Sequence, residues 1–302
     1  MKLRMSANFQ SSQFHNWIAA TRPKTLSASV GPVAMGTAIA NGDGVLHAGG
    51  ACAALLGALG VQVACNFAND YFDARQGADT RDRLGPVRAV AAGLISANAM
   101  LSAAIGVIVI IVAPCVVYLT LRAGWTFAVL GSLSIALAFA YTGSRWSLAY
   151  LGLGDLFALL FFGPVAVAGT YAAQATVWTW TPAIAGLGIG LLASALISVN
   201  NLRDESTDRL AGKRTCAVRF GLVFARAEYA VCVVGAMIVG VAMAWWTSHW
   251  YCASIGLAGC MLIPSVKRIL GGTDGRALNR ELAATGRAIL AYGVFFAIGW
   301  SL

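Results

Sequence analysis

Charged residues are scarce in this chain. Only 11% of its 302 residues are Asp, Glu, Lys or Arg, 59% are hydrophobic, and the mean hydropathy is +0.73. A soluble globular protein of this length carries far more charge on its surface. The composition therefore excludes an ordinary soluble domain and indicates a helical protein that lies in a lipid bilayer.

The seven cysteines lack the spacing of a metal site or a disulfide framework. None belongs to a CxxC pair, and most lie inside apolar runs. Zinc sites and disulfide-rich domains need cysteines at characteristic spacings. We therefore interpret the cysteines as small packing residues.

The first residues lack the features of a cleavable signal peptide. Residues 1–13 are polar and contain no contiguous apolar core followed by a small-residue cleavage site. We expect residues 1–16 to form a polar tail and residues 17–302 to form a single transmembrane domain, whose first helix stays as an anchor.

Nine apolar runs make up most of the chain, and most of them approach the ~20 residues that a membrane-crossing helix needs. The runs occupy approximately residues 26–40, 45–69, 99–121, 125–141, 148–173, 179–199, 222–247, 250–266 and 283–302. We predict an all-α, polytopic membrane protein with nine transmembrane helices.

The net charge of +9 follows the loops of this nine-span scheme. Twenty of the 21 Lys and Arg residues lie at the amino terminus or in alternate loops, and only Arg122 departs from the pattern. This positive-inside distribution explains the basic balance without nucleic acid as a partner. We expect a cytoplasmic (inner) membrane protein with its amino terminus in the cytoplasm and its carboxyl terminus outside.

Two clusters of carboxylates and amides interrupt the apolar pattern. The first cluster, residues 66–73, ends the second run, and the second cluster, residues 200–208, ends the sixth. Each repeats the order Asn, Asp, Asp: Asn66, Asp70 and Asp73, then Asn200, Asp204 and Asp208. On a helix, each trio falls within roughly 60° to 80°, so each cluster is one polar face.

The spacing of the two clusters predicts a parallel internal repeat. Four runs separate the two helix ends, so both emerge on the same side of the membrane. Carboxylates this close repel one another unless a cation lies between them. Carboxylate and amide oxygens suit Mg²⁺ or another hard divalent ion, which keeps waters or substrate phosphates as further ligands. We predict a magnesium and diphosphate site shared by the two clusters.

Arginine or lysine follows each acidic cluster within about ten residues. An anion bound there could contact the metal on one side and guanidinium or ammonium groups on the other. Its remainder should be hydrophobic because the site lies at the mouth of a lipid-embedded bundle, and an isoprenoid diphosphate has both properties. For Arg22 and Lys24, near the start of the first span, a phosphate contact and a topological anchor stay equally open.

A protease is one alternative, because residues 152–155 read Gly-Leu-Gly-Asp. A GxGD sequence also occurs in intramembrane aspartyl proteases. Their dyad needs two lone carboxylates that share a proton. This chain has two clusters of carboxylates and amides instead, which favours a cation.

A transporter of cations or organic anions is the other alternative. It would also use an internal repeat and carboxylates in the membrane, but these should lie near the bilayer midplane. Here the acids lie at helix ends beside basic loops. This placement favours a site with access from one side only.

Several longer motifs resemble those of a known family. They lie at residues 22–26, 69–73, 85–88, 93–95, 141–143, 152–155, 200–204 and 212–215. Together they are similar to the signatures of the UbiA superfamily of membrane prenyltransferases, and residues 85–88 lean toward its naphthoate-prenylating branch. The resemblance runs over nearly the whole chain.

This resemblance implies a nine-helix bundle in which Mg²⁺ bridges both clusters to a polyprenyl diphosphate. The implied catalytic metal ligands are Asp70, Asp73, Asp204 and Asp208, and the implied diphosphate contacts are Asn66, Asn200, Arg88, Lys213, Arg214, Arg22 and Lys24. The implied reaction prenylates 1,4-dihydroxy-2-naphthoate with loss of carbon dioxide and gives demethylmenaquinone. Residues 144–146 depart from the usual glycine- and proline-rich stretch near the acceptor pocket, so 4-hydroxybenzoate or another aromatic acceptor remains the alternative. Nothing in the sequence predicts the oligomeric state.

Overall fold

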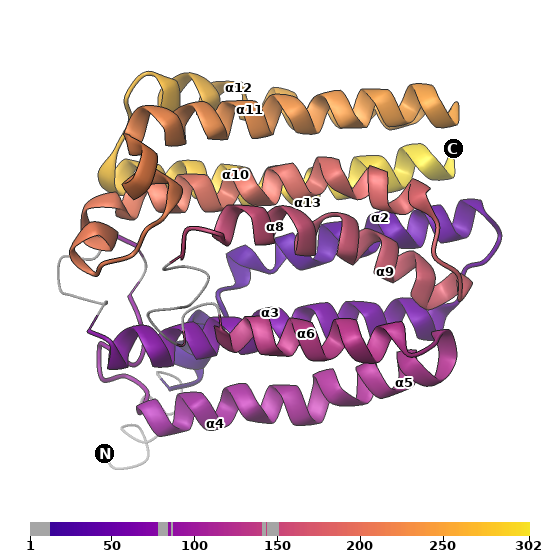
Figure 1. Cartoon of the computed structure of the whole chain (residues 1–302). Coiled ribbons are helices and arrows are strands. Elements are labelled where there is room, and N and C mark those ends of the chain that lie inside the picture. The colour runs from indigo at the N-terminus through magenta and orange to yellow at the C-terminus, as the bar shows by residue number, and fades with distance from the viewer. Residues whose placement is uncertain (1–12, 78–83, 86, 141–142, 144–150) are drawn as a thin grey trace, which may run out of the picture.

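The computed structural model describes residues 13–77, 84–85, 87–140, 143 and 151–302. Within these residues the regular structure is helical, with no β-strand, and the long helices run roughly parallel or antiparallel in one bundle (Figure 1). A first helix at residues 13–21 begins within the predicted tail. Its Trp17 ring packs edge-on against Phe67, with ring centroids 5.7 Å apart.

The helices of the first half are α2 (Ser27–Gly42), α3 (Ala48–Arg75), α4 (Ala97–Val107), α5 (Ala113–Ala123) and α6 (Thr126–Ala140). A π-helical turn, Ile108–Val112, joins α4 to α5. Those of the second half are α8 (Gly154–Phe162), α9 (Pro164–Ala175), α10 (Trp180–Leu210), α11 (Cys216–Thr247), α12 (Ile255–Leu270) and α13 (Leu278–Ser301). Short 3-10 turns occupy Pro23–Thr25, Trp250–Ser254 and Gly275–Ala277.

Each of the nine predicted apolar runs contains at least one helix within the described residues, and the run at 148–173 divides into α8 and α9. Among the described residues, seven helical segments are long and apolar enough to cross a membrane. The helices α2 and α6, with 16 and 15 residues, are shorter. The prediction of an all-helical, multi-pass membrane protein is confirmed, whereas the count of nine crossing helices stays a prediction.

Glycines allow α8 and α9 to pack closely against α10. The helical path bends at Gly163, directly before Pro164 opens α9. A Cβ at Gly163 would lie 2.6 Å from the carbonyl oxygen of Gly186 and 2.8 Å from the Cα of Gly190. Small residues at such crossings are the usual means of close helix approach in membranes. The contact brings the amino-terminal end of α8 against the polar end of α10.

The carboxyl-terminal ends of α3 and α10 lie at the same end of the bundle, opposite the carboxyl-terminal end of α13 (Figure 1). Both acidic clusters therefore lie at one end, as the parallel repeat predicts. Arg122, the basic residue that departs from the predicted charge pattern, lies in the last turn of α5 at the opposite end of the bundle. Its guanidinium donates to the carbonyl oxygens of Ala173 and Gln174, at 3.0 and 2.8 Å, and so caps the end of α9.

Candidate functional site

A cavity of about 890 Å³ lies between the two halves of the bundle. Its polar wall includes all four predicted metal-ligating aspartates, and the rest of the wall is mainly apolar. The lining extends to Leu119 and Phe127, close to the ends of α5 and α6 that lie opposite the acidic end of the bundle (Figure 1). The cavity thus joins a polar head region to a long apolar chamber.

The first cluster is the last two turns of α3, and its carboxylates organise the chain that follows. Asp70 accepts hydrogen bonds from the backbone N–H groups of Ala89 and Val90, at 3.0 and 3.1 Å. Asp73 accepts one from Arg88 Nη2 at 2.8 Å. Because both aspartates are almost fully buried, these contacts fold residues 88–90 back onto the polar face of α3.

The amide of the first cluster ties the amino-terminal segment to the site. Asn66 Nδ2 donates to the carbonyl oxygen of Thr21 at 2.9 Å. The next residue, Arg22, has a left-handed backbone with φ of 53°, which is uncommon for a residue other than glycine. The turn at Arg22 directs the chain from the first helix into α2 beside the cavity.

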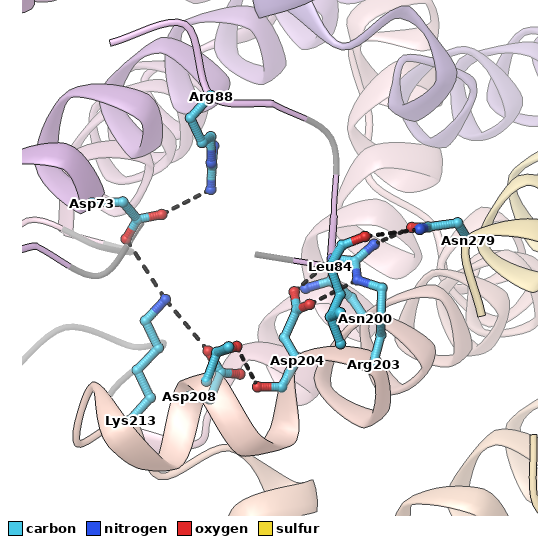
Figure 2. Close-up of polar contacts among 10 residues, drawn as sticks. Asp73, Leu84, Arg88, Asn200, Arg203, Asp204, Asp208, Lys213 and Asn279 are labelled. Atoms are coloured by element: carbon cyan, nitrogen blue, oxygen red, sulfur yellow. Dashed lines mark hydrogen bonds and ion pairs between the residues drawn. The ribbon is translucent and has the colours of Figure 1, made fainter. Parts of the chain in front are cut away.

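The second cluster, on α10, contains a buried ion pair. Both oxygens of Asp204 accept hydrogen bonds from its neighbour Arg203, from Nε at 2.7 Å and from Nη2 at 2.5 Å (Figure 2). Arg203 also donates to Asn200 Oδ1 and to Asn279 Oδ1, each at 2.8 Å. Asn279 in turn donates to the carbonyl oxygen of Leu84 at 2.9 Å, so α13 and the α3–α4 connection are both joined to this cluster.

The two clusters meet at Lys213. Its Nζ lies 3.6 Å from Asp73 Oδ1 and 3.6 Å from Asp208 Oδ1, so one ammonium group lies between a carboxylate of each half (Figure 2). The structure therefore places the two acidic faces around a common centre. The expectation that they converge at one end of the bundle is confirmed for the described residues.

The donor set fits a hard divalent cation. Asp73 Oδ1 is buried and accepts no hydrogen bond within the part of the chain that the structure describes. Asp208 faces the same point from the other half. Asp70 and Asp204 are already hydrogen-bonded, but each carboxylate has about four lone-pair sites and can accept further ligands. An all-oxygen set of this kind suits Mg²⁺.

Most of the predicted diphosphate contacts line the cavity: Arg22, Asn66, Arg88, Asn200 and Lys213. Arg214 is exposed and is absent from the cavity wall. The side chain of Lys24 and residues 144–146 lie outside the described residues.

The sequence patterns did not predict one contact in this region, between Asn201 and Asp155. Asn201 Nδ2 donates to both oxygens of Asp155, at 3.3 and 3.2 Å, and both residues are buried in the cavity wall. The GxGD motif at residues 152–155 appears in the protease alternative and in the family resemblance, but neither assigns a role to Asp155. The adjacent amides Asn200 and Asn201 are a weak indication of this contact, because neighbouring side chains on a helix point in different directions and so meet different partners.

The fold and the site together define an integral membrane enzyme of the prenyltransferase class: a helical bundle with paired acidic clusters and basic residues at the mouth of an apolar cavity. The chain belongs to the UbiA prenyltransferase family, whose family model matches residues 29–286.

Similar sequences cover almost the full chain. The 1,4-dihydroxy-2-naphthoate octaprenyltransferase of Escherichia coli K12 is 33% identical over 96% of this chain and 96% of its own. The Mycobacterium tuberculosis protein of the same name is 35% identical over 93% of this chain and 95% of its own.

Solved structures share the fold at low identity. A UbiA homologue from Archaeoglobus fulgidus, bound to DMAPP and Mg²⁺, is 13% identical, with a TM-score of 0.60 over 94% of this chain and 99% of that one. A digeranylgeranylglyceryl phosphate synthase is 14% identical, with a TM-score of 0.64 over 96% of this chain and 99% of that one.

Proposed function

We propose that this protein transfers a polyprenyl group from a polyprenyl diphosphate to 1,4-dihydroxy-2-naphthoate, with loss of carbon dioxide, and so forms demethylmenaquinone. The observation that carries the proposal is the convergence of Asp73 and Asp208 on one centre at the mouth of an apolar cavity. The similar proteins of E. coli and M. tuberculosis, both named for this acceptor, support the choice of reaction.

The acidic centre is proposed to hold Mg²⁺. Asp73 and Asp208 would be its principal ligands, with Asp70 and Asp204 as supporting ligands. When bound, the ion supplies charge stabilisation to the departing diphosphate. The A. fulgidus homologue, whose structure contains DMAPP and Mg²⁺, supports this assignment.

Basic and amide side chains at the same mouth are proposed to bind the diphosphate oxygens. Arg88 is delivered there by the turn that Asp70 holds, and Lys213 already lies between the two halves. Charge-assisted hydrogen bonds from such groups are stronger than those from neutral donors. Arg22, Asn66 and Asn200 line the same region and would complete the set. Lys24 stays a predicted contact, whereas the exposed Arg214 is absent from this wall.

The apolar part of the cavity is proposed to hold the polyprenyl tail. Its lining by Val61, Leu137 and Phe157 excludes water from the carbon that loses diphosphate. Exclusion of water protects the allylic cation from hydrolysis and strengthens the surrounding electrostatic contacts.

We further propose that the site opens toward the cytoplasm from an inner membrane, with the carboxyl terminus outside. The distribution of Lys and Arg over alternate loops supports this orientation. Prenylation of 4-hydroxybenzoate or another aromatic acceptor is the alternative, and it would use the same donor site.

A product assay tests the proposal. Purified protein in lipid nanodiscs is incubated with Mg²⁺, farnesyl or a longer polyprenyl diphosphate, and equal amounts of 1,4-dihydroxy-2-naphthoate and 4-hydroxybenzoate. Mass spectrometry should detect the prenylated, decarboxylated naphthoquinol, and product should disappear when EDTA is added. Release of no diphosphate with any acceptor would contradict the proposal and favour transport.

A further inference from the structure

Asp155 is a buried carboxylate in the cavity wall that the donor site does not use. It is only 6% exposed and lines the same cavity as the acidic clusters. Among the described acidic residues of this wall, Asp70, Asp73, Asp204 and Asp208 belong to the clusters, and Asp155 is the one outside them. A buried carboxylate in a membrane-embedded cavity is costly unless it has a function or strong partners.

The local fold fixes the position of this carboxylate. Gly152 has a left-handed backbone with φ of +73°, and a Cβ there would collide with the carbonyl oxygen of Arg214. This close contact anchors the start of α8 against the segment that leads into α11. Together with the packing of Gly163 on α10, it holds Asp155 at the second residue of α8, where the helix dipole stabilises an anion.

Asn201 relates Asp155 to the donor site. On α10, Asn201 lies one turn before Asp204, which corresponds to a rise of about 4.5 Å along the helix. Asp155 lies within 3.3 Å of the Asn201 amide nitrogen, so its carboxylate lies beside α10 at about the level of the turn before Asp204. The acceptor ring must come within roughly 3–3.5 Å of the prenyl carbon that bears the diphosphate. A ring that extends from that carbon one helical turn into the cavity brings its polar edge to Asp155, which lines the same cavity.

The partners of Asp155 leave it able to bind one more donor. A carboxylate offers about four lone-pair sites, and the Asn201 amide, the Cys216 thiol and the backbone N–H of Asp155 occupy part of them. The Cys216 sulfur and a Glu228 oxygen lie close by, with the three ligand atoms within 4.8 Å of one another. Neither Cys216 nor Glu228 lines the cavity. They sit behind Asp155, which leaves Asp155 as the member of this group that meets a substrate.

We propose that Asp155 binds the aromatic acceptor by accepting a hydrogen bond from one of its ring hydroxyls, and that Asn201 holds the carboxylate in place for this contact. The inference rests on the proposed function and assigns its acceptor subsite. The hydrogen bond raises the electron density of the ring, whose π electrons form the new bond to the prenyl carbon while diphosphate leaves with the pair of the broken C–O bond. The hydroxyl keeps its proton, because departure of carbon dioxide returns the bonding pair to the ring.

The first test compares Asp155→Asn with the unaltered protein. The variant should raise the KM for the acceptor at least tenfold, while the KM for polyprenyl diphosphate and the affinity for Mn²⁺ change less than twofold. The matched control is Glu228→Gln, which alters a carboxyl group of the same cluster that does not line the cavity, and it should leave the acceptor KM unchanged. An unchanged acceptor KM in Asp155→Asn would overturn the proposal.

The second test uses the two monomethyl ethers of the acceptor, and its first comparison needs only the unaltered protein. The unaltered protein should turn over one ether at least tenfold less efficiently than the parent acceptor, because that ether has lost the hydroxyl that Asp155 binds. Asp155→Asn should lose this discrimination, which a purely structural role would leave intact. Equal turnover of both ethers and the parent acceptor would overturn the proposal. If the preferred acceptor proves to be a hydroxybenzoate, its methyl ether takes the same place, so failure of the acceptor choice is distinguished from failure of this inference.

Discussion

The two acidic clusters contain corresponding aspartates, but different groups hold these aspartates in position. In each cluster the first aspartate accepts two hydrogen bonds within the protein and the second faces Lys213, and Asp73 also accepts a hydrogen bond from Arg88. Asp70 accepts two backbone N–H groups from the turn at residues 88–90, whereas Asp204 accepts two guanidinium N–H groups from Arg203. The residue before the first aspartate differs accordingly: Asn69 in one half, Arg203 in the other.

This difference separates the aspartates that hold the structure in place from those available to bind a ligand. Backbone donors are neutral, so the two hydrogen bonds that Asp70 accepts at residues 89 and 90 depend on the conformation of a turn. Arg203 brings a full positive charge, so Asp204 is part of a buried ion pair. The common element is the second aspartate, and Asp73 and Asp208 are equivalent in their distance from Lys213.

The largest effect should come from removing the equivalent aspartates. We expect Asp73→Asn and Asp208→Asn each to lower product formation at least about a thousandfold, because each removes a proposed ligand of the ion that would stabilise the departing diphosphate by several kcal/mol. Both variants should also lose Mn²⁺ binding, measured by electron paramagnetic resonance. Glu205→Gln is the matched control, since it neutralises a carboxylate of the same helix that is absent from the cavity wall. Near-normal activity in either aspartate variant would break the equivalence of the two halves.

The next effect should separate the first aspartates from each other by stability. Asp204→Asn leaves Arg203 buried without its counter-charge, which should cost about 3–5 kcal/mol of the free energy of unfolding. Asp70→Asn replaces one of the two carboxylate oxygens that accept backbone N–H groups, and it should lower the free energy of unfolding by about 1–3 kcal/mol. Thermal unfolding in detergent measures both. The double variant Arg203→Gln with Asp204→Asn should regain part of the loss, and equal destabilisation by the two single variants would contradict the comparison.

A smaller effect is expected for the residue between the clusters. Lys213→Met should raise the KM for polyprenyl diphosphate about tenfold, through loss of a charge-assisted contact. Without substrate it should tighten Mn²⁺ binding, because the ammonium group competes with a metal for Asp73 and Asp208. Arg209→Met is the control, as Arg209 pairs with Glu205 on the exposed side of α10. Weaker Mn²⁺ binding in Lys213→Met would count against this competition.

Much of this arrangement could be predicted from local patterns. Helical periodicity placed each Asn, Asp, Asp trio on one face, and the number of apolar runs between the clusters placed both faces at the same end. Apolar composition and loop charge predicted a multi-pass helical protein. These inferences need only neighbours along the chain, a fixed helical repeat and the parity of membrane crossings.

The contacts that decide the roles of individual residues were beyond local patterns. The links from Asn201 to Asp155, from Arg203 to Asn279 and from Asn279 to Leu84 join residues 46, 76 and 195 positions apart. Which residues meet over such separations depends on how the helices cross, and glycine contacts such as Gly163 on α10 set those crossings. For the same reason, local patterns predict the same diphosphate contact for Lys213 and Arg214, although of these two only Lys213 lines the cavity.

The smallest expected effect concerns Asn279, which links the second cluster to the α3–α4 connection. Asn279→Ala should cost about 1–2 kcal/mol of stability, because Arg203 and the carbonyl oxygen of Leu84 each lose a buried hydrogen bond. Asn279→Asp separates the two contacts, since its carboxylate still accepts from Arg203 but repels the Leu84 oxygen. If the tie to Leu84 positions the α3–α4 connection and thereby Arg88, then Asn279→Asp should raise the KM for polyprenyl diphosphate as much as Asn279→Ala does. A KM raised only by Asn279→Ala would place the role of Asn279 in orienting Arg203 instead, and the two clusters would then be stabilised independently of each other.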